Sequence, residues 1–388
     1  MKVLFINYAD FTSPSGMHIF HLANQLAARG VACTVYSPGL ASSAARYGRP
    51  RFVSAAYPET KPRDLALSLL SSGGEYLIHA WTPREKVRFL TEEIARWLRA
   101  PRIVHMEDNE EAIAAEIMKF RDPAEREDLG TILAAYREFL RSAQGYTAII
   151  EELMDFCPPG LPAHVFWPAC EEDFFSLPEE SSPEDKAAWG IPANCLTLLY
   201  PGGIHASNAQ EVKDLFSAVL RLQLAGLPTR IIRFGYHVTT VLEGMYAAAG
   251  HPECLVDLTA SILPADLPRV MRAVDVLVQP GRDSPFNKYR FPCKLPMFLA
   301  SGRPVILPAT NLGRRLEHGK NCLLLREGSE QEIYACVRLL ADKPDLARTL
   351  GRAGREYARA HFSWERSAAG LLAFYERVLA DWRRGKEH

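Results

Sequence analysis

The sequence predicts an α/β protein that contains two doubly wound parallel sheets. Short apolar stretches without alternation recur along the chain, and amphipathic helical stretches separate them, as in a sheet with both faces covered. A segment rich in Pro, Ser and acidic residues, Leu177–Pro192, interrupts this order near the middle of the 388 residues. A chain of this length also exceeds one ordinary domain. We therefore predict a first domain over 1–175, a linker over 176–192 and a second domain over 193–362.

The first half opens with a strand-helix-strand unit. An apolar strand at Val3–Ile6 leads through a Ser- and Gly-containing loop into a helix that runs from His18 to Leu26. Gly30 ends this helix, and a second strand follows at Val31–Tyr36. Such a unit is the right-handed crossover of a parallel sheet. Three more strands are predicted at Tyr76–Ala80, Arg102–Met106 and Gly145–Ile150.

The second half repeats the alternation after the linker. Its predicted helix spans Gln210–Leu224. Two similar α/β halves predict a cleft between them, and ligands of open α/β sheets bind at the carboxyl ends of the strands. The loops that follow the strands therefore matter most for function. The strands are predicted at Leu196–Tyr200, Thr229–Phe234, Val274–Val278 and Arg303–Leu307.

Charge and cysteine usage narrow the class of protein. Lys and Arg number 45 against 46 Asp and Glu, a balance that gives no long-range field for a polyanion, so we expect no nucleic-acid partner. The eight cysteines form no CxxC pair or zinc-like cluster, which fits a reducing compartment. The apolar run at Val3–Ile6 is too short for a signal sequence or a membrane span. We expect a cytoplasmic protein.

Between Pro264 and Phe362 six short motifs follow one another, at Leu267–Met271, Ala273–Pro280, Phe291–Leu295, Phe298–Ile306, Glu317–Leu325 and His361–Trp364. In this order they resemble the C-terminal half of family 4 glycosyltransferases and their GT-B relatives. Near the N-terminus, Gly16, the helix after it and Gly30 also resemble the start of that family.

This resemblance implies a GT-B fold, with two Rossmann-like domains facing a cleft. It implies that the C-terminal domain binds a nucleotide-diphosphate sugar as donor substrate, without another cofactor, and that the N-terminal domain binds the acceptor. It also implies transfer with retention of the anomeric configuration. The closing helix, 365–388, should pack back on the first domain. Its apolar residues recur at helical spacing: Leu371, Leu372, Phe374, Tyr375, Val378 and Leu379.

The loop after the first strand of the second half is a candidate phosphate site. Gly202 and Gly203 lack the Cβ atom that would keep a phosphate from the backbone. A Gly pair alone predicts a plain turn equally well. Asn208 and Arg282 are further candidate donor-binding residues on loops of this half.

The segment from Arg290 to Gly302 is predicted to turn from a loop into a helix, with Pro292 near the first helical turn. Free backbone amides there would face a diphosphate, and Arg290 and Lys294 supply positive charge. The alternative is that both side chains are solvated at the surface. The expected donor-binding set is completed by Pro292, Cys293, Leu295 and Met297 of the same motif and by Gly16 at the start of the first helix.

At two positions the sequence departs from the resembling family. Members usually carry a Glu, seven residues and a second Glu, and Tyr289 and Met297 occupy these positions here. The Arg and Lys usually found after the first C-terminal strand are also missing from Gly202–Asn208. This departure keeps open a non-catalytic GT-B scaffold that binds a nucleotide sugar or a partner enzyme. A nucleotide-sugar epimerase is a third hypothesis, for which the sequence offers no acid/base pair.

Two histidines are the candidate catalytic residues. His18 follows Gly16 at a predicted helix start, where backbone amides could meet a phosphate or an acceptor. His105 ends a predicted strand, and the resemblance places a histidine of this region near the reacting sugar. The acidic run Glu107–Glu111 after it would, in the simpler interpretation, be the first turn of a helix.

The predictions about metal dependence, acceptor and membrane contact rest on weaker sequence signals. No Asp-x-Asp motif lies at a convincing strand end, so we predict metal-independent transfer to a glycan, a lipid-linked or a small-molecule acceptor. The stretch Arg84–Arg99 is a basic amphipathic helix that could touch the inner face of a membrane weakly. The alternative is a solvated helix that packs Phe89, Leu90 and Leu98 inward.

Overall fold

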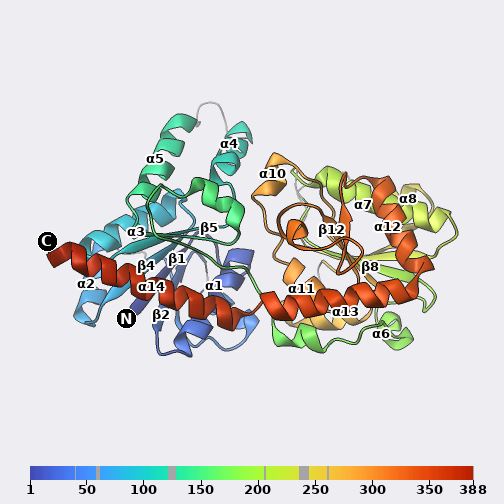
Figure 1. Cartoon of the computed structure of the whole chain (residues 1–388), viewed down its shortest axis with the longest axis horizontal. Coiled ribbons are helices and arrows are strands. Elements are labelled where there is room, and N and C mark those ends of the chain that lie inside the picture. The colour runs from blue at the N-terminus through green and yellow to red at the C-terminus, as the bar shows by residue number, and fades with distance from the viewer. Residues whose placement is uncertain are drawn as a thin grey trace. The chain divides into compact units, whose positions relative to one another are not determined.

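The computed structural model describes residues 1–39, 41–57, 62–120, 128–204, 207–235, 244–259 and 262–387. The chain forms two compact units, each around one parallel sheet (Figure 1). The predicted fold class, two doubly wound parallel-sheet α/β domains, is therefore confirmed. The first unit comprises Met1–Pro168, Tyr289–Phe291 and Trp364–His388, and the second comprises Ala169–Lys288 and Pro292–Ser363.

The sheet of the first unit has seven parallel strands in the order β3-β2-β1-β4-β5-β6-β7. The strand order reverses between β1 and β4, the point where open α/β sheets bind ligands. The strands are β1 (Lys2–Asn7), β2 (Ala32–Ser37), β3 (Val53–Ala56), β4 (Tyr76–Trp81), β5 (Arg102–Met106), β6 (Gly145–Ala148) and β7 (Ala163–Val165).

Helices cover both faces of this sheet. The first helix begins at the N-cap Ser13, whose hydroxyl accepts a hydrogen bond from the Gly16 amide at 3.0 Å, and Pro14 opens it. The α-helices are α1 (Pro14–Ala27), α2 (Pro62–Ser71), α3 (Glu85–Leu98), α4 (Glu110–Phe120), α5 (Leu129–Arg141) and α14 (Trp364–Glu387), with 3-10 helices η1 (Ala41–Tyr47) and η3 (Glu151–Phe156).

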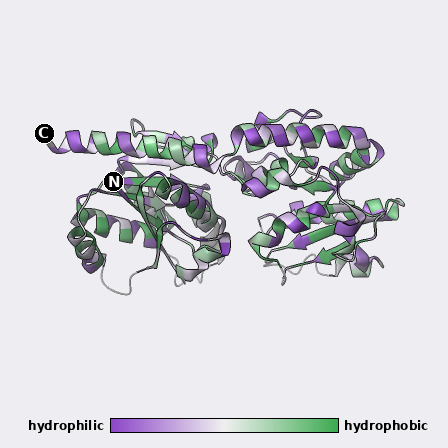
Figure 2. Ribbon diagram, turned by 90° about the horizontal axis from the view of Figure 1, so that it is seen from below, coloured by the Kyte–Doolittle hydropathy of each residue, from purple (hydrophilic) through white to green (hydrophobic). Residues whose placement is uncertain are grey.

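Helix α14 is amphipathic and belongs to the first unit (Figure 2). Its apolar face buries Leu371, Phe374, Tyr375 and Val378 almost completely. Gly145 of β6 makes room for this face, since an added Cβ would lie 3.0 Å from the Phe374 ring. Burial of these four side chains is what holds the helix on the unit.

The expectation that helix α3 packs Phe89 and Leu90 inward is correct for only one of them. Leu90 is buried as expected, but Phe89 is 56% exposed and Trp97 is 37% exposed. Helix α2 packs alongside and leaves Leu67 and Leu70 exposed. Because α3 buries a narrow stripe centred on Val87 and Ile94, its remaining aromatic residues face outward.

The second unit repeats the arrangement with six parallel strands in the order β10-β9-β8-β11-β12-β13. The order again reverses in the centre, between β8 and β11. The strands are β8 (Leu196–Pro201), β9 (Thr229–Phe234), β10 (Leu255–Asp257), β11 (Val276–Val278), β12 (Val305–Pro308) and β13 (Leu323–Leu325). The α-helices are α6 (Pro183–Ala187), α7 (Ala209–Leu224), α8 (Met245–Ala248), α9 (Leu267–Arg272), α10 (Pro285–Lys288), α11 (Leu295–Ala300), α12 (Glu330–Asp342) and α13 (Pro344–His361).

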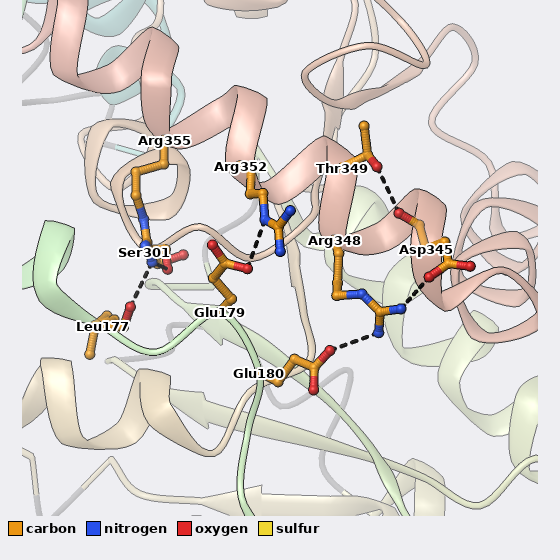
Figure 3. A network of polar contacts seen from close by, with 9 residues as sticks. All are labelled: Leu177, Glu179, Glu180, Ser301, Asp345, Arg348, Thr349, Arg352 and Arg355. Atoms are coloured by element: carbon orange, nitrogen blue, oxygen red, sulfur yellow. Dashed lines mark hydrogen bonds and ion pairs between the residues drawn. The ribbon is translucent and has the colours of Figure 1, made fainter.

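Residues 176–192, predicted as a linker, belong to the second unit. Arginines spaced along α13 reach the first part of this segment (Figure 3). Most of these pairs are solvent-exposed and each contributes little, but together they fix the path of the chain. The bonds run from Arg355 to the Leu177 carbonyl (2.7 Å), from Arg352 to Glu179 (2.8 Å) and from Arg348 to Glu180 (2.8 Å).

Candidate functional site

The carboxyl ends of β1, β4 and β5 bring polar side chains together in the first unit. Asn7 pairs in register with Trp81, and Trp81 with His105, so these three side chains lie on one face of the sheet. Glu107 comes two residues after His105, just beyond the strand. Helix α1 starts above the same edge and carries His18. The strand ends and the helix start thus form one polar cluster.

A histidine–carboxylate pair is the centre of this cluster. The Nδ1 atom of His18 lies 2.8 Å from Oε1 of Glu107, and both side chains are buried. Burial alone would raise the pKa of Glu107, but hydrogen bonds from His18 and Ser15 outweigh it and lower the pKa below its usual value. The ionised carboxylate only accepts hydrogen bonds, so the shared proton sits on Nδ1 of His18. The Nε2 atom of His18 is buried and has no partner among the described residues.

Further charged groups surround the pair. Arg84 lies 3.7 Å from the centre of the Tyr8 ring and binds Glu110 through two hydrogen bonds of 2.9 and 3.1 Å. Burial raises the pKa of Tyr8 to about 12, and the negative charge of Glu107 adds to this effect. The Tyr8 phenol therefore remains protonated at neutral pH. Ser15 lies within hydrogen-bond distance of the Tyr8 hydroxyl at 3.2 Å.

Asp108 is the unusual acid of the site. Burial, together with the carboxylates of Glu110 and Glu107, raises its pKa to about 7, although Arg290 and Arg84 partly oppose this shift. The residue is half-buried at the end of β5. A carboxyl group that titrates near neutral pH at a strand end is a frequent feature of functional sites.

His105 lies deeper than predicted. Its ring is fully buried between Trp81, at a centroid distance of 3.9 Å, and Phe166, at 4.9 Å. Its Nδ1 atom lies 2.9 Å from the Thr147 hydroxyl, and burial keeps its pKa well below the usual value. His105 is therefore a neutral residue beneath the edge of the sheet, and direct contact with a ligand would have to involve its unpartnered Nε2 atom.

A buried hydrogen-bond chain continues from His105 through the sheet. The Thr147 hydroxyl also lies 2.9 Å from Nε2 of His79, whose Nδ1 atom lies 2.6 Å from the Tyr375 hydroxyl of α14. Burial lowers the pKa of His79 to about 3, so this ring is neutral as well. Thr147 has one proton, so it donates to one ring and accepts from the other. This chain fixes the orientation of both rings.

Strain and unpartnered polar atoms mark the same edge of the sheet. Thr82, directly after β4, has a φ of 71°, a left-handed conformation that a β-branched residue rarely adopts. Its buried hydroxyl has no partner among the described residues, and neither has Oδ1 of Asn7. Together with Nε2 of His18 and of His105, these are buried polar atoms near the strand ends that have no partner among the described residues.

Gly16 serves packing at this edge rather than a special backbone angle. A Cβ atom here would lie 2.3 Å from the Asp10 carbonyl oxygen and 2.5 Å from Cα of Phe11. The glycine therefore lets the start of α1 approach the loop that follows β1.

In the second unit, Lys294 lies beside the predicted phosphate loop. An added Cβ at Gly202 would be 2.6 Å from the Lys294 ammonium, which stands 4.5 Å above the Tyr200 ring. Gly235, at the end of β9, approaches Gly202 just as closely, because its own added Cβ would lie 2.7 Å from the Gly202 carbonyl carbon. A positive charge and a backbone without side chains thus meet at the carboxyl end of β8.

Asn208 joins this loop from the N-cap of α7. Its side-chain amide donates a hydrogen bond of 3.0 Å to the Gly203 carbonyl, which also accepts one of 3.2 Å from the Tyr200 hydroxyl. Four predicted donor-binding residues therefore come together here: Gly202, Gly203, Asn208 and Lys294.

The remaining predicted residues lie apart from that group. Arg282 is exposed on the loop after β11. Arg290 belongs to the first unit, where its charge lowers the pKa of Asp108. Helix α11 begins at Leu295, not near Pro292, and the Leu295 amide donates a hydrogen bond of 3.0 Å to the Pro292 carbonyl. Pro296 supplies the helix-opening proline. Leu295 and Met297 are buried, and Cys293 is half-buried.

Several site residues carry too little local signal to be predicted from the sequence. Glu107 was visible only as one acid in an acidic run, and its histidine partner is 89 positions away. Tyr8 and Ser15 carry no sequence signal beyond lying after a strand and before a helix. Nothing in the local sequence marks Thr82 as strained.

The described residues show neither a metal site nor a membrane span. Within the described ranges, no three His, Cys, Asp or Glu side chains gather as a metal site would require. None of the helices in the described part of the chain is long and apolar enough to span a membrane.

Parts of the chain are similar to known proteins. Residues 218–373 match a family described as "Glycosyl transferase-like". A D-inositol 3-phosphate glycosyltransferase of Saccharomonospora viridis is 26% identical over 213 residues, which are 51% of this chain and 46% of that protein. A second such enzyme, from an Arthrobacter strain, is 26% identical over 235 residues, 58% of this chain and 50% of that protein. The chain thus matches about half the length of these curated relatives.

Solved structures resemble the chain over nearly its whole length. Anabaena Alr3699/HepE in complex with UDP superposes with a TM-score of 0.72 at 16% identity, covering 97% of this chain and 100% of that one. Sucrose-phosphate synthase of Thermosynechococcus elongatus gives a TM-score of 0.70 at 15% identity, covering 98% and 100%. The chain therefore has the GT-B fold. Most of the region that is similar to glycosyl transferases, residues 218–373, lies in the second unit.

Proposed function

We propose that this chain is a glycosyltransferase, near family 4, that moves a sugar from a nucleotide-diphosphate sugar to an acceptor. The observation that carries the proposal is the meeting of Lys294 with the Gly202–Gly203 loop at the carboxyl end of β8. The similarity of residues 218–373 to glycosyl transferases supports it. So does the fold shared with a protein that was solved in complex with UDP.

The donor diphosphate would bind at this loop. Gly202 offers backbone without a side chain, and the Lys294 ammonium lies next to it as a point charge. Charge that develops on a leaving diphosphate is stabilised best by groups already in place before the reaction. Lys294 suits that requirement, because its ammonium group already lies beside Gly202, 4.5 Å from the centre of the Tyr200 ring.

The acceptor hydroxyl would bind at the polar cluster of the first unit. There the His18–Glu107 pair has the arrangement of a general base and the group that orients it. With Nδ1 donating to Glu107, Nε2 of His18 can take the proton of the hydroxyl as its oxygen attacks the sugar. Glu107 would stabilise the imidazolium that forms.

Two routes for this proton predict different products. The resemblance implies retention, without a metal, in which case the leaving diphosphate takes the proton itself. If His18 takes the proton, the attack can come from the face opposite the leaving group, and the anomeric configuration inverts. The anomeric configuration of the product, read by proton NMR, distinguishes the two routes.

The alternative is a non-catalytic scaffold that binds a nucleotide sugar, suggested by Tyr289 and Met297 at the usual Glu positions. One experiment separates it from the transferase. The purified chain is mixed with UDP, GDP and ADP sugars and a panel of acceptors, while nucleoside diphosphate release and the melting temperature are both followed. Release supports the transferase, and a melting shift without release supports the scaffold. If no donor gives either diphosphate release or a melting shift, both the transferase and the scaffold hypotheses are rejected.

A weak contact with membranes is part of this proposal, because it would suit a lipid-linked acceptor. Phe89 and Trp97 of α3 are exposed, and so are Leu67 and Leu70 of the neighbouring helix α2. Arg63 lies 4.8 Å from the Trp97 ring centre. Exposed aromatic and leucine side chains beside arginines are typical of surfaces that lie on anionic lipid.

A further inference from the structure

A cavity lies in the second unit, away from the donor loop. It has a volume of about 370 Å³, and Leu196, Val276 and Pro304, at the amino ends of β8, β11 and β12, line it. Gly202 and Gly203 follow the carboxyl end of β8, so the cavity opens at the opposite edge of the same sheet. Because substrates of open α/β sheets bind at the carboxyl edge, this cavity is not part of the donor site.

Arg303 lines the cavity as a buried cation. Its side chain is among the largest that are fully buried, with 1% of the residue exposed. One hydrogen bond is made by its guanidinium, from Nη2 to the Arg272 carbonyl at 3.1 Å. The Nε and Nη1 atoms are buried without an acceptor in the described part of the chain. Three N–H donors of this side chain are therefore unused.

The other charges around the cavity are already paired. Lys186 binds Asp275 at 2.7 Å, and Arg348 binds Glu180 at 2.8 Å. Asp275 is used further, since it accepts from the Thr197 amide at 2.8 Å. Among the described residues, no carboxylate lies within ion-pair distance of Arg303. Of the cations that line the cavity, Arg303 is the one whose charge is left without a direct counterion.

The protonation of Arg303 decides whether this side chain carries an unpaired charge. Burial lowers its pKa to about 10, although the charge of Asp275 opposes the shift. The side chain therefore stays protonated at neutral pH. A buried charge without a partner is costly, and folded proteins normally satisfy it with a carboxylate or a bound anion.

We propose that this cavity binds a small oxyanion, the phosphate group of a metabolite, with Arg303 as its principal ligand. Guanidinium donors match phosphate oxygens in geometry and charge. Cavities of a few hundred Å³ hold small organic ligands, so there is room for a short organic body beside the phosphate. Arg348 also lines the cavity, near the start of α13, where it binds Glu180 and Asp345 (Figure 3).

The experiment compares melting temperatures of wild type, Arg303→Met and Lys294→Ala in inorganic phosphate and in sodium chloride of equal ionic strength. The sodium chloride series removes the general effect of salt on the exposed α13 pairs. Phosphate should raise the melting temperature of wild type and Lys294→Ala by about 2–4 °C near tenfold the dissociation constant, and leave Arg303→Met unchanged. Glycerol 3-phosphate should give the same shift at lower concentration if the organic body is also bound.

Each other result overturns the proposal. A concentration of about 50 mM phosphate is far above the dissociation constant expected for a cellular metabolite. If this concentration does not shift the melting temperature of wild type, the cavity binds no oxyanion. A shift that survives in Arg303→Met but disappears in Lys294→Ala means that phosphate binds the donor loop. Should Arg303→Met not fold, Arg303→Lys replaces it, because it keeps the charge but loses the fork of donors. A shift in Arg303→Lys as large as in wild type would then refute a role for the guanidinium.

Discussion

His18 and Glu107 are 89 positions apart in the sequence, yet the imidazole Nδ1 atom lies 2.8 Å from a carboxylate oxygen of Glu107. Both side chains are buried, and neither is the obvious partner of the other from the sequence alone. The pair joins helix α1 to the end of β5, beside the point where the strand order of the first sheet reverses. Buried histidine–carboxylate pairs also occur for purely structural reasons. The position of this pair, at the edge where open α/β sheets bind ligands, is therefore what suggests a function.

Removing the base should slow turnover and spare donor binding. His18→Asn keeps a side-chain N–H that can donate to Glu107 but removes the basic nitrogen. We expect turnover to fall by about 10²–10⁴-fold, the usual contribution of a general base, while nucleoside diphosphate affinity stays unchanged. Steady-state rates and calorimetric titration measure the two quantities. The control is His251→Ala, a partly exposed histidine of the second unit. Wild-type turnover in His18→Asn would assign the proton to the leaving diphosphate.

Replacing Lys294 tests the donor loop. Lys294→Ala should weaken binding of a nucleoside diphosphate by about tenfold or more, because a charge-assisted hydrogen bond to phosphate contributes on the order of 1.5–3 kcal/mol. Binding of the matching nucleoside should not change. The matched control is Lys320→Ala, which removes an exposed lysine paired with Glu317. Equal losses for nucleoside and diphosphate would place the phosphates elsewhere, and Arg290→Ala would then be the next variant to titrate.

Asp108 should make the protein less stable as pH rises. Its pKa is about 7 in the folded chain and 3.8 in a model peptide, so between these values the folded state holds more protons than the unfolded one. Stability from this group is thus full below about pH 4 and declines as pH rises through 7. Asp108→Asn removes the effect, so its melting temperature should gain on wild type from pH 5 to pH 8. A constant difference across that range would show that Asp108 titrates normally.

Gly16 should not tolerate even a methyl group. Gly16→Ala places a Cβ atom 2.3 Å from the Asp10 carbonyl oxygen, and such overpacking typically costs about 1–3 kcal/mol. Denaturant unfolding measures this loss. Gly385→Ala is the control, because no atom lies within 4 Å of its added Cβ, and alanine there should be neutral or stabilise α14 by up to about 1 kcal/mol. Similar stabilities of the two variants would mean that the loop after β1 can move away.

The exposed face of α2 and α3 should decide membrane contact. Wild type should sediment with vesicles that contain anionic phosphatidylglycerol and much less with pure phosphatidylcholine. The double variant Phe89→Ser, Trp97→Ser should lose most of this binding, because it removes the two aromatic side chains that would enter the interface. Leu224→Ser, on the second unit, is the control, since Leu224 is equally apolar and 65% exposed. Sedimentation that is unchanged in the double variant would rule out this face.

The sequence by itself determined the architecture. Buried parallel strands need apolar residues on both faces, so runs such as Arg102–Met106 and Thr229–Phe234 could be assigned to strands with the bounds that the structure shows. The turn after β8 was visible because Gly202 and Gly203 stand together directly behind such a run. Local chemistry was sufficient in these cases, since each signal lies within a few neighbouring residues.

Tertiary structure alone decided which side chains meet. His105 was expected at the site, but its place in the strand puts it beneath the edge, between Trp81 and Phe166. Glu107, two residues on, reaches His18 instead. Phe89 was expected to pack inward, yet α3 had enough apolar surface to cover its part of the sheet without that ring. Burial, pairing and pKa depend on neighbours brought together from distant parts of the chain, and no local pattern encodes those distances.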